Sequence, residues 1–222
     1  MSKYKMIVMF GLLIMIFSIS QVYAIMFGYS LMGKVFYIDA GHGGIDSGAV
    51  YGNLLEKDIN LILAKKIESE LSMRGAIVYQ TRNDDSDLAI TTNGRKRSDL
   101  ANRARLINSS ESDMYISIHL NYISSSKWKG LQIFYNNKNS ENEIIAKTMT
   151  EFLKENMANV RDYKYSNDFY MYQLISRPGI LIEMGFLSNA DDRYRLTRDK
   201  YQDELVNNVV NAIERYFILK NK

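Results

Sequence analysis

The two histidines of the chain occupy matching positions relative to predicted strands. His42 follows the apolar run Lys34–Asp39, in a glycine-rich segment, and His119 closes the β-rich run Met114–His119. An imidazole at the edge of a sheet can be reached by solvent and by a metal ion. A single loop histidine is more often merely solvated or hydrogen-bonded, but two at equivalent strand ends favour a common role. Because the 222 residues include no cysteine, any zinc site here must combine histidine with carboxylate ligands.

Two carboxylates could complete such a site. Glu56 begins a predicted helix fourteen residues after His42, where the chain can return to the same edge of the sheet. Taken alone, Glu56 is also explained as a first-turn acid that the helix dipole favours. Glu183 ends the apolar run Ile180–Ile182, so we expect it to be partly buried. A buried carboxylate is costly unless it is paired or used, which leaves a structural salt bridge and a catalytic base as equal alternatives.

The glycines around His42 let the backbone turn tightly and approach a neighbouring group closely. The segment 40–44 lacks the G-x-G-x-x-G spacing and the Lys-Ser/Thr pair of nucleotide-binding loops, so a phosphate-binding role is disfavoured.

Alternating strands and helices must position these groups. The patterns predict strands at Lys34–Asp39, Ala76–Thr81, Met114–His119, Gly130–Tyr135 and Ile180–Glu183, and helices from about Glu56, after a Ser98/Asp99 cap, at Glu141–Asn156 and at about Tyr201–Phe217. This order predicts an α/β fold: one layered domain with a mostly parallel central sheet flanked by helices. Functional groups of such sheets gather in loops after the carboxyl ends of the strands.

Composition excludes several classes of protein. The formal net charge is only +3, and no Lys/Arg stripe with interleaved aromatic residues is present, so we expect no nucleic-acid partner. The absence of cysteine excludes a disulfide framework, a thiolate nucleophile and iron–sulfur clusters.

The first 33 residues are predicted to be a signal peptide or an N-terminal membrane anchor, and residues 34–222 a single domain. Lys3 and Lys5 precede a segment, 6–33, that contains no charged residue, and Val22–Ala24 offers a loose cleavage site. The uncharged segment is also long enough to span a bilayer, so cleaved signal and retained anchor stay open. The predicted location is the extracytoplasmic cell envelope.

Four segments of the body resemble a known family, the zinc-dependent N-acetylmuramoyl-L-alanine amidases with a LytC/AmiC-type catalytic domain (Amidase_3). The segments are Asp39-Ala40-Gly41-His42-Gly43-Gly44 with Asp46 and Gly48, Glu56–Leu61, Ser117–Asn121 and Ile182–Asn189. They occur in the family's order, and the resemblance runs from about Val35 to Phe217. The family often has Pro where Ala40 stands and small residues where Leu120 and Tyr122 stand.

The resemblance implies a role for each matched residue. His42, Glu56 and His119 would be ligands of Zn²⁺, and Glu183 would be the catalytic carboxylate. The reaction would be hydrolysis of the amide between the lactyl group of muramic acid and the L-Ala of the peptidoglycan stem peptide. Asp39 and Asn121 are candidates for supporting the ligands or orienting the substrate, because ligand histidines need a partner on the second ring nitrogen. Ordinary loop hydrogen bonding explains them equally well.

The single-domain form most resembles the germination-specific, CwlD-like branch of the family. That branch acts in spore-cortex maturation, where a peptidoglycan deacetylase completes muramic δ-lactam after the amidase has acted. The elements between His119 and Glu183 look like ordinary parts of the domain rather than a plug of the site. An unplugged hydrolase needs another form of control, so an activator or regulatory envelope protein is an expected partner. The aromatic segment Tyr163–Tyr172 is either such a contact surface, for glycan or partner, or part of the core.

Two other functions fit the same residues. A zinc peptidase or carboxypeptidase acting on wall peptides would use the same chemistry. A wall-binding module without catalysis is disfavoured by the presence of all four residues, His42, Glu56, His119 and Glu183.

Overall fold

The computed structural model describes residues 3–220; the side chains of residues 7 and 20–28 are outside this description. Its elements are α1 (Lys3–Gly28), β1 (Val35–Ala40), β2 (Val50–Tyr51), β3 (Leu54–Leu55), α2 (Glu56–Met73), β4 (Ile77–Gln80), α3 (Arg95–Ser109), β5 (Met114–Asn121), β6 (Gln132–Tyr135), α4 (Glu141–Asn156), β7 (Lys164–Tyr165), α5 (Tyr170–Leu174), β8 (Gly179–Phe186), α6 (Ala190–Leu196) and α7 (Asp199–Lys220).

A six-stranded sheet forms the centre, in the order β4-β1-β5-β8-β6-β7. The pairs β1/β4, β1/β5, β5/β8 and β6/β7 are parallel, and only β6/β8 is antiparallel. β2 and β3 form a separate short hairpin. The predicted single α/β domain with a mostly parallel sheet is therefore confirmed.

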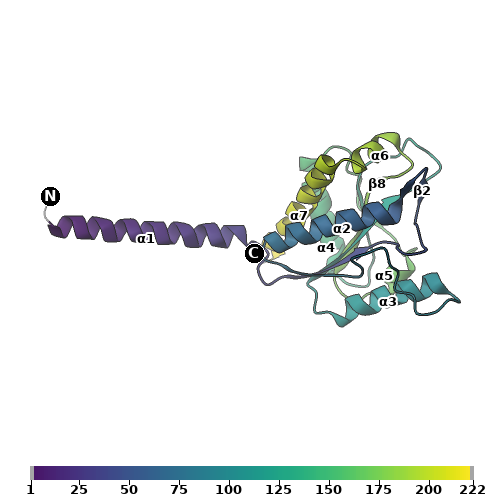
Figure 1. The fold of residues 1–222 in the computed structure, drawn as a ribbon, viewed down its shortest axis with the longest axis horizontal. Coiled ribbons are helices and arrows are strands. Elements are labelled where there is room, and N and C mark those ends of the chain that lie inside the picture. The colour runs from purple at the N-terminus through teal and green to yellow at the C-terminus, as the bar shows by residue number, and fades with distance from the viewer. Residues whose placement is uncertain (1–2, 221–222) are drawn as a thin grey trace.

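Helices cover both faces of this sheet (Figure 1). The apolar residues of α2, α4 and α7 pack on one face in a large cluster, which includes Leu63, Ile67, Val209 and Ile213. A smaller cluster on the other face joins α3 and α5 through Ala104, Ile107 and Met171. β8 is buried at every position, as expected for a strand that is covered on both faces.

The segment that links α1 to the sheet packs against the domain. Leu31 is fully buried in the large cluster, and its N–H donates to the carbonyl of Arg74 at 3.0 Å. Helix α1 itself extends away from the domain (Figure 1). Among the side chains that the structure describes, no helix combines the length and the apolar character that crossing a membrane requires.

The expected start of the third helix was wrong. Ser98 and Asp99 were predicted to cap it, but α3 begins at Arg95, after Gly94 in a left-handed conformation. Ser98 and Asp99 lie inside the helix, where their side chains accept hydrogen bonds from the N–H groups of Ile90 and Leu88. They therefore tie the preceding loop to α3 instead of capping the helix.

Part of the aromatic segment Tyr163–Tyr172 packs in the core, while Tyr165 stays 41% exposed. Tyr163 packs on Tyr135, while Phe169 and Tyr172 pack together in the smaller cluster. Residues 168–172 also line the pocket described below.

Candidate functional site

A pocket of about 540 Å³ lies at the carboxyl edge of β1, β5 and β8. It contains the four residues that the sequence singles out, His42, Glu56, His119 and Glu183. His42 follows β1, Glu56 begins α2, and His119 pairs in register with Glu183 of β8. The strand order thus brings together residues that are up to 141 positions apart (183 − 42).

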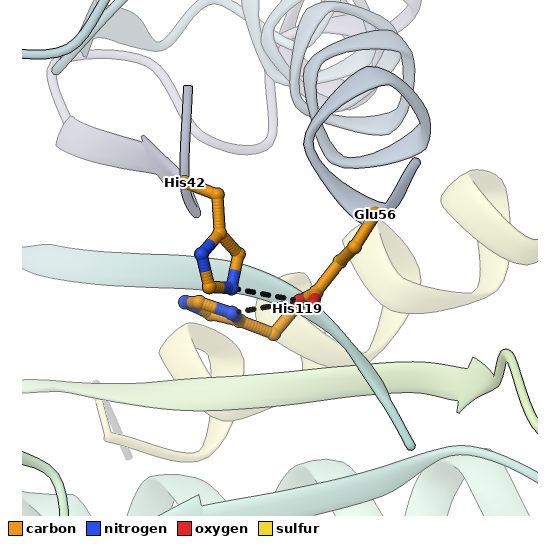
Figure 2. A group of neighbouring side chains, drawn as sticks. All are labelled: His42, Glu56 and His119. Carbon is orange, nitrogen blue, oxygen red and sulfur yellow. Dashed lines mark hydrogen bonds and ion pairs between the residues drawn. The ribbon is translucent and has the colours of Figure 1, made fainter. Parts of the chain in front are cut away.

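The carboxylate of Glu56 approaches both imidazole rings, which meet edge to face with their centres 5.0 Å apart (Figure 2). Its Oε1 is 3.3 Å from Nε2 of His42 and 3.0 Å from Nδ1 of His119. One ligand atom from each of the three residues falls within 4.8 Å of the others. In a tetrahedral zinc site, bonds of about 2.0–2.1 Å place two ligand atoms about 3.3 Å apart. The donor set and the two distances to Oε1 therefore suit a metal ion such as Zn²⁺.

Backbone groups hold the buried Glu56 carboxylate in place. Ala49 N–H donates to Oε2 at 2.8 Å, and Leu120 N–H donates to Oε1 at 3.0 Å. Burial opposes ionisation of Glu56, but hydrogen bonds and charge from His119 and His42 outweigh it and hold the pKa of Glu56 well below its ordinary range. Glu56 is thus ionised, and its carboxylate is held in one orientation. A carboxylate must be ionised to bind a metal ion.

Asp46 orients His42. Its carboxylate lies 3.0 Å from Nδ1 of His42, which leaves Nε2 directed at Glu56. Burial lowers the pKa of His42, but hydrogen bonds to Asp46 and Glu56 outweigh it and raise that pKa to about 9. A carboxylate on the second ring nitrogen fixes the orientation of a ligand histidine. Asp46 belongs to the first motif, but the sequence does not indicate this role, because residues 42–46 form a loop in which no regular spacing predicts contacts.

Two motif glycines allow the side chains of His119 and Glu56 to approach the backbone closely. A Cβ at Gly41 would lie 2.4 Å from Nε2 of His119, and one at Gly48 would lie 2.6 Å from Oε2 of Glu56. Gly48 also has φ of +64°, which L side chains rarely adopt.

Two buried arginines clamp the loop that carries His42. Arg82 donates from Nε to the carbonyl of Ala40 at 2.8 Å and from Nη2 to that of Gly41 at 3.1 Å. Arg103 donates to the carbonyl of Ala40 at 2.8 Å and to that of His42 at 2.6 Å. His42 has φ of +63°, an uncommon conformation for a residue other than glycine. The clamp maintains this conformation and so aims the imidazole.

Asp39 belongs to this clamp and not to the histidine rings. Its Oδ1 accepts hydrogen bonds at 2.8 Å from both Thr81 and Arg103, and Ser117 donates to Oδ2. Burial opposes ionisation, but Arg103 and Ser117 outweigh it and lower the pKa of Asp39. Asp39 acts on His42 only through Arg103. Asn121 lines the pocket, and its carbonyl accepts the N–H of Leu187 at 2.7 Å.

Glu183 differs from the other carboxylates because its Oε2 is buried without a hydrogen-bond partner. Burial and the charge of Glu56 raise the pKa of Glu183 to about 8. No ion pair joins it to another described residue, so the salt-bridge alternative is not supported. A carboxyl group with such a pKa can exchange protons near neutral pH.

The fold and the site together define a small α/β protein with a histidine–carboxylate group of metal-binding type at the carboxyl edge of its sheet. The family model of the N-acetylmuramoyl-L-alanine amidases, Amidase_3, matches residues 36–215. The chain belongs to this family, as its four motifs predicted.

Individual relatives support the same assignment. The chain is 47% identical over 195 residues to the germination-specific N-acetylmuramoyl-L-alanine amidase of Bacillus subtilis, covering 86% of this chain and 82% of that protein. The CwlD amidase of Clostridioides difficile, solved in complex with the GerS lipoprotein, superimposes with a TM-score of 0.79 at 35% identity, over 84% of this chain and all (100%) of that one. The catalytic domain of the amidase CwlV of Bacillus (Paenibacillus) polymyxa superimposes with a TM-score of 0.73 at 30% identity, over 83% of this chain and 98% of that one.

The arginine clamp predicts a large loss of stability for Arg103→Met. This change leaves Asp39 and Asp99 buried without their cation, at a cost of about 3–5 kcal/mol in the free energy of unfolding. Arg74→Met is the matched control, because Arg74 pairs with Glu70 and Glu214 at the far end of α2, where the charges are more exposed; its cost should be about 1 kcal/mol. Urea unfolding of both variants in chelator measures the difference. Equal losses of unfolding free energy in the two variants would show that Arg103 stabilises the protein no more than Arg74 does.

The raised pKa of Glu183 predicts a pH effect on the metal-free protein. The folded protein holds this proton up to about pH 8, whereas the unfolded chain loses it near 4.5, so unfolding releases a proton between these values. The stability that Glu183 contributes is therefore present below pH 4.5 and lost as the pH rises through 8. Glu183→Gln should gain stability relative to the unchanged protein between pH 5 and pH 8 in urea unfolding with chelator. A constant difference between the two proteins across that range would contradict the assigned pKa.

Proposed function

We propose that His42, Glu56 and His119 bind one Zn²⁺ and that Glu183 is the catalytic base of the amidase reaction. The observation that carries the proposal is the arrangement of three aimed ligand atoms beside a buried, unpaired carboxyl group in one pocket. The bond cleaved is the amide between the lactyl group of muramic acid and L-Ala of the stem peptide.

A bound zinc ion would supply a Lewis acid and lower the pKa of water from 15.7 toward ~7. The protein side chains perform the remaining tasks. Asp46 and the arginine clamp hold His42 in its orientation. Glu183 accepts a proton from the attacking water and returns it to the amine of the departing L-Ala. Its burial keeps its pKa close to the range in which both transfers are feasible. Asp39 and Asn121 support the site, Asp39 through Arg103 and Asn121 from the pocket wall.

We propose a role in spore-cortex maturation for this activity. The support is the likeness to the germination-specific amidase of B. subtilis along 86% of the chain. A peptidoglycan deacetylase would then act on the peptide-free muramic acid to complete the δ-lactam.

We also propose that the protein works outside the cytoplasmic membrane and that an envelope protein regulates it. Residues 1–33, with Lys3 and Lys5 before an uncharged segment, support an export signal or membrane anchor. The similar CwlD amidase of C. difficile was solved with a lipoprotein, which supports a partner of that kind. The longest helix between β5 and β8, α4, packs on α7 and the sheet, and none of its residues lines the pocket. Helix α4 therefore does not plug the site, which leaves control to a partner.

Two variants test the assigned roles. Glu183→Gln should lower the release of stem peptides from peptidoglycan by about 10²–10⁴-fold, because the base is lost, while the bound zinc stays near one per chain. His119→Ala should lose both activity and zinc, because two ligands cannot hold the ion. Amine release and metal analysis of the purified proteins give the two readouts. Unchanged release by Glu183→Gln would refute its role, and unchanged zinc in His119→Ala would refute the ligand set.

The cortex role has its own test. Expression of this chain in a B. subtilis strain that lacks its germination-specific amidase should restore muramic δ-lactam to the spore cortex. Mass spectrometry of cortex muropeptides measures it, and the Glu183→Gln form is the matched control. An active protein that restores no δ-lactam would place the amidase in the vegetative wall instead.

A further inference from the structure

Two half-exposed aromatic side chains belong to segments that adjoin the pocket residues in the chain. Tyr51 of β2 is 45% exposed, and Trp128, in the loop after β5, is 46% exposed. Each ring is stacked on an arginine: Cζ of Arg193 lies 3.4 Å from the centre of the Tyr51 ring, and Cζ of Arg161 lies 4.4 Å from that of Trp128. One face of each ring is therefore covered by a guanidinium, and the exposed area belongs to the rest of the ring.

The two arginines are themselves fixed by the fold. Arg193 donates to the carbonyl of Leu187 at 2.9 Å. Arg161 lies between Trp128 and the buried ring of Phe186 and donates to Gln132 at 3.2 Å. Both aromatic rings are thus held on rigid supports before any ligand arrives, which reduces the entropy that binding must overcome.

Both rings belong to the same side of the domain, because the start of α6 holds both. Arg193 is a residue of α6. Asn189, the N-cap of α6, donates to the carbonyl of Ser126 at 2.7 Å, and Asp192 accepts the N–H of Gly130 at 2.8 Å. The loop that carries Trp128 is therefore anchored to the helix that supports Tyr51.

This side is continuous with the pocket. The β2–β3 hairpin lies between Ala49 and Glu56, which are hydrogen-bonded to each other in the pocket. The loop of Trp128 begins after Asn121 and Tyr122, which also line the pocket. The opposite wall comes from α3 and α5, with Lys96 and Tyr170. A substrate cleaved at the metal group can therefore extend in two directions, toward α3 and α5 or toward α6.

We propose that Tyr51 and Trp128 form a glycan platform that binds the sugar chain of the substrate on the α6 side, while the stem peptide lies along α3 and α5. Pyranose rings present C–H bonds on their faces, and these pack on the flat face of an aromatic ring. On the wall formed by α3, the side chain of Lys96 is 70% exposed and its Nζ lies 3.6 Å from Asp46, so it still presents charge to the carboxylates of a stem peptide. The arginines under the platform are held against their rings. This inference rests on the proposed function, since it assumes a muramoyl-peptide substrate.

The single tryptophan of the chain provides a direct test, because Trp128 is the only indole fluorophore. The probe is peptide-free glycan strands of alternating N-acetylglucosamine and N-acetylmuramic acid, titrated into the full-length protein. We expect a saturable change in tryptophan fluorescence, with binding weakened about tenfold in Tyr51→Ala. Tyr79→Ala is the matched control: Tyr79 is 52% exposed and stacks on Tyr37, but it lies on the edge strand β4 and should leave binding unchanged.

Kinetics provide the second readout. Trp128→Ala should raise KM on long peptide-bearing strands about tenfold with kcat unchanged, and leave kcat/KM on N-acetylmuramoyl-tripeptide within about twofold.

Unaltered tryptophan fluorescence with glycan, or equal losses of kcat/KM on both substrates, would overturn the platform. A fluorescence change with an envelope lipoprotein but none with glycan would overturn it in favour of a protein partner. The glycan titration needs no catalysis, so a protein that binds glycan but releases no amine would refute the proposed function alone.

Discussion

One buried carboxylate organises this site. Glu56 is ionised in a place where an unpaired charge would be very costly, so the fold must surround it with compensating groups. It does so with two imidazoles, two backbone N–H groups and the side-chain amide of Asn60. The hairpin before α2, the end of β5 and the loop after β1 all meet at this side chain. The same contacts gather a possible histidine–carboxylate metal site around this side chain.

A second group of buried charges, around Arg103, maintains the conformation of the loop that carries His42. Arg103 is buried between Asp39 and Asp99 and directs its remaining N–H groups at the carbonyls of the loop that carries His42. The loop conformation at His42 is uncommon, so it persists only because the surroundings impose it. Glu183 differs from both groups: its Oε2 has no hydrogen-bond partner, and its pKa is raised by burial and by the nearby charge of Glu56. Two carboxylates in one pocket thus have pKa values shifted in opposite directions, which is the basis of the different roles proposed for Glu56 and Glu183.

Much of this was readable in the sequence, and the parts that were not have physical reasons. The strands β1 and β5 were predicted as continuous apolar or β-rich runs and the helices α2 and α4 from their helical period, and the predicted bounds agree closely with the structure. The β2–β3 hairpin was missed because two-residue strands carry no alternation, and α6 was missed because seven residues are too few for a clear period. The start of α3 was misplaced because Ser98 and Asp99 look like capping residues but bind the preceding loop. The clamp of Arg82 and Arg103 joins residues more than 40 positions apart, as in Arg103 to Asp39 (103 − 39 = 64), which no local pattern reveals.

The central claim is that the site is assembled before the metal arrives. Crystal structures with and without zinc, with the ion located by its anomalous scattering, test this most directly. The account predicts zinc bound to Nε2 of His42, to the carboxylate of Glu56 and to a ring nitrogen of His119, with the backbone of residues 40–44 in the same place in both structures. Zinc bound elsewhere, or a loop that becomes ordered only with the metal, would contradict it.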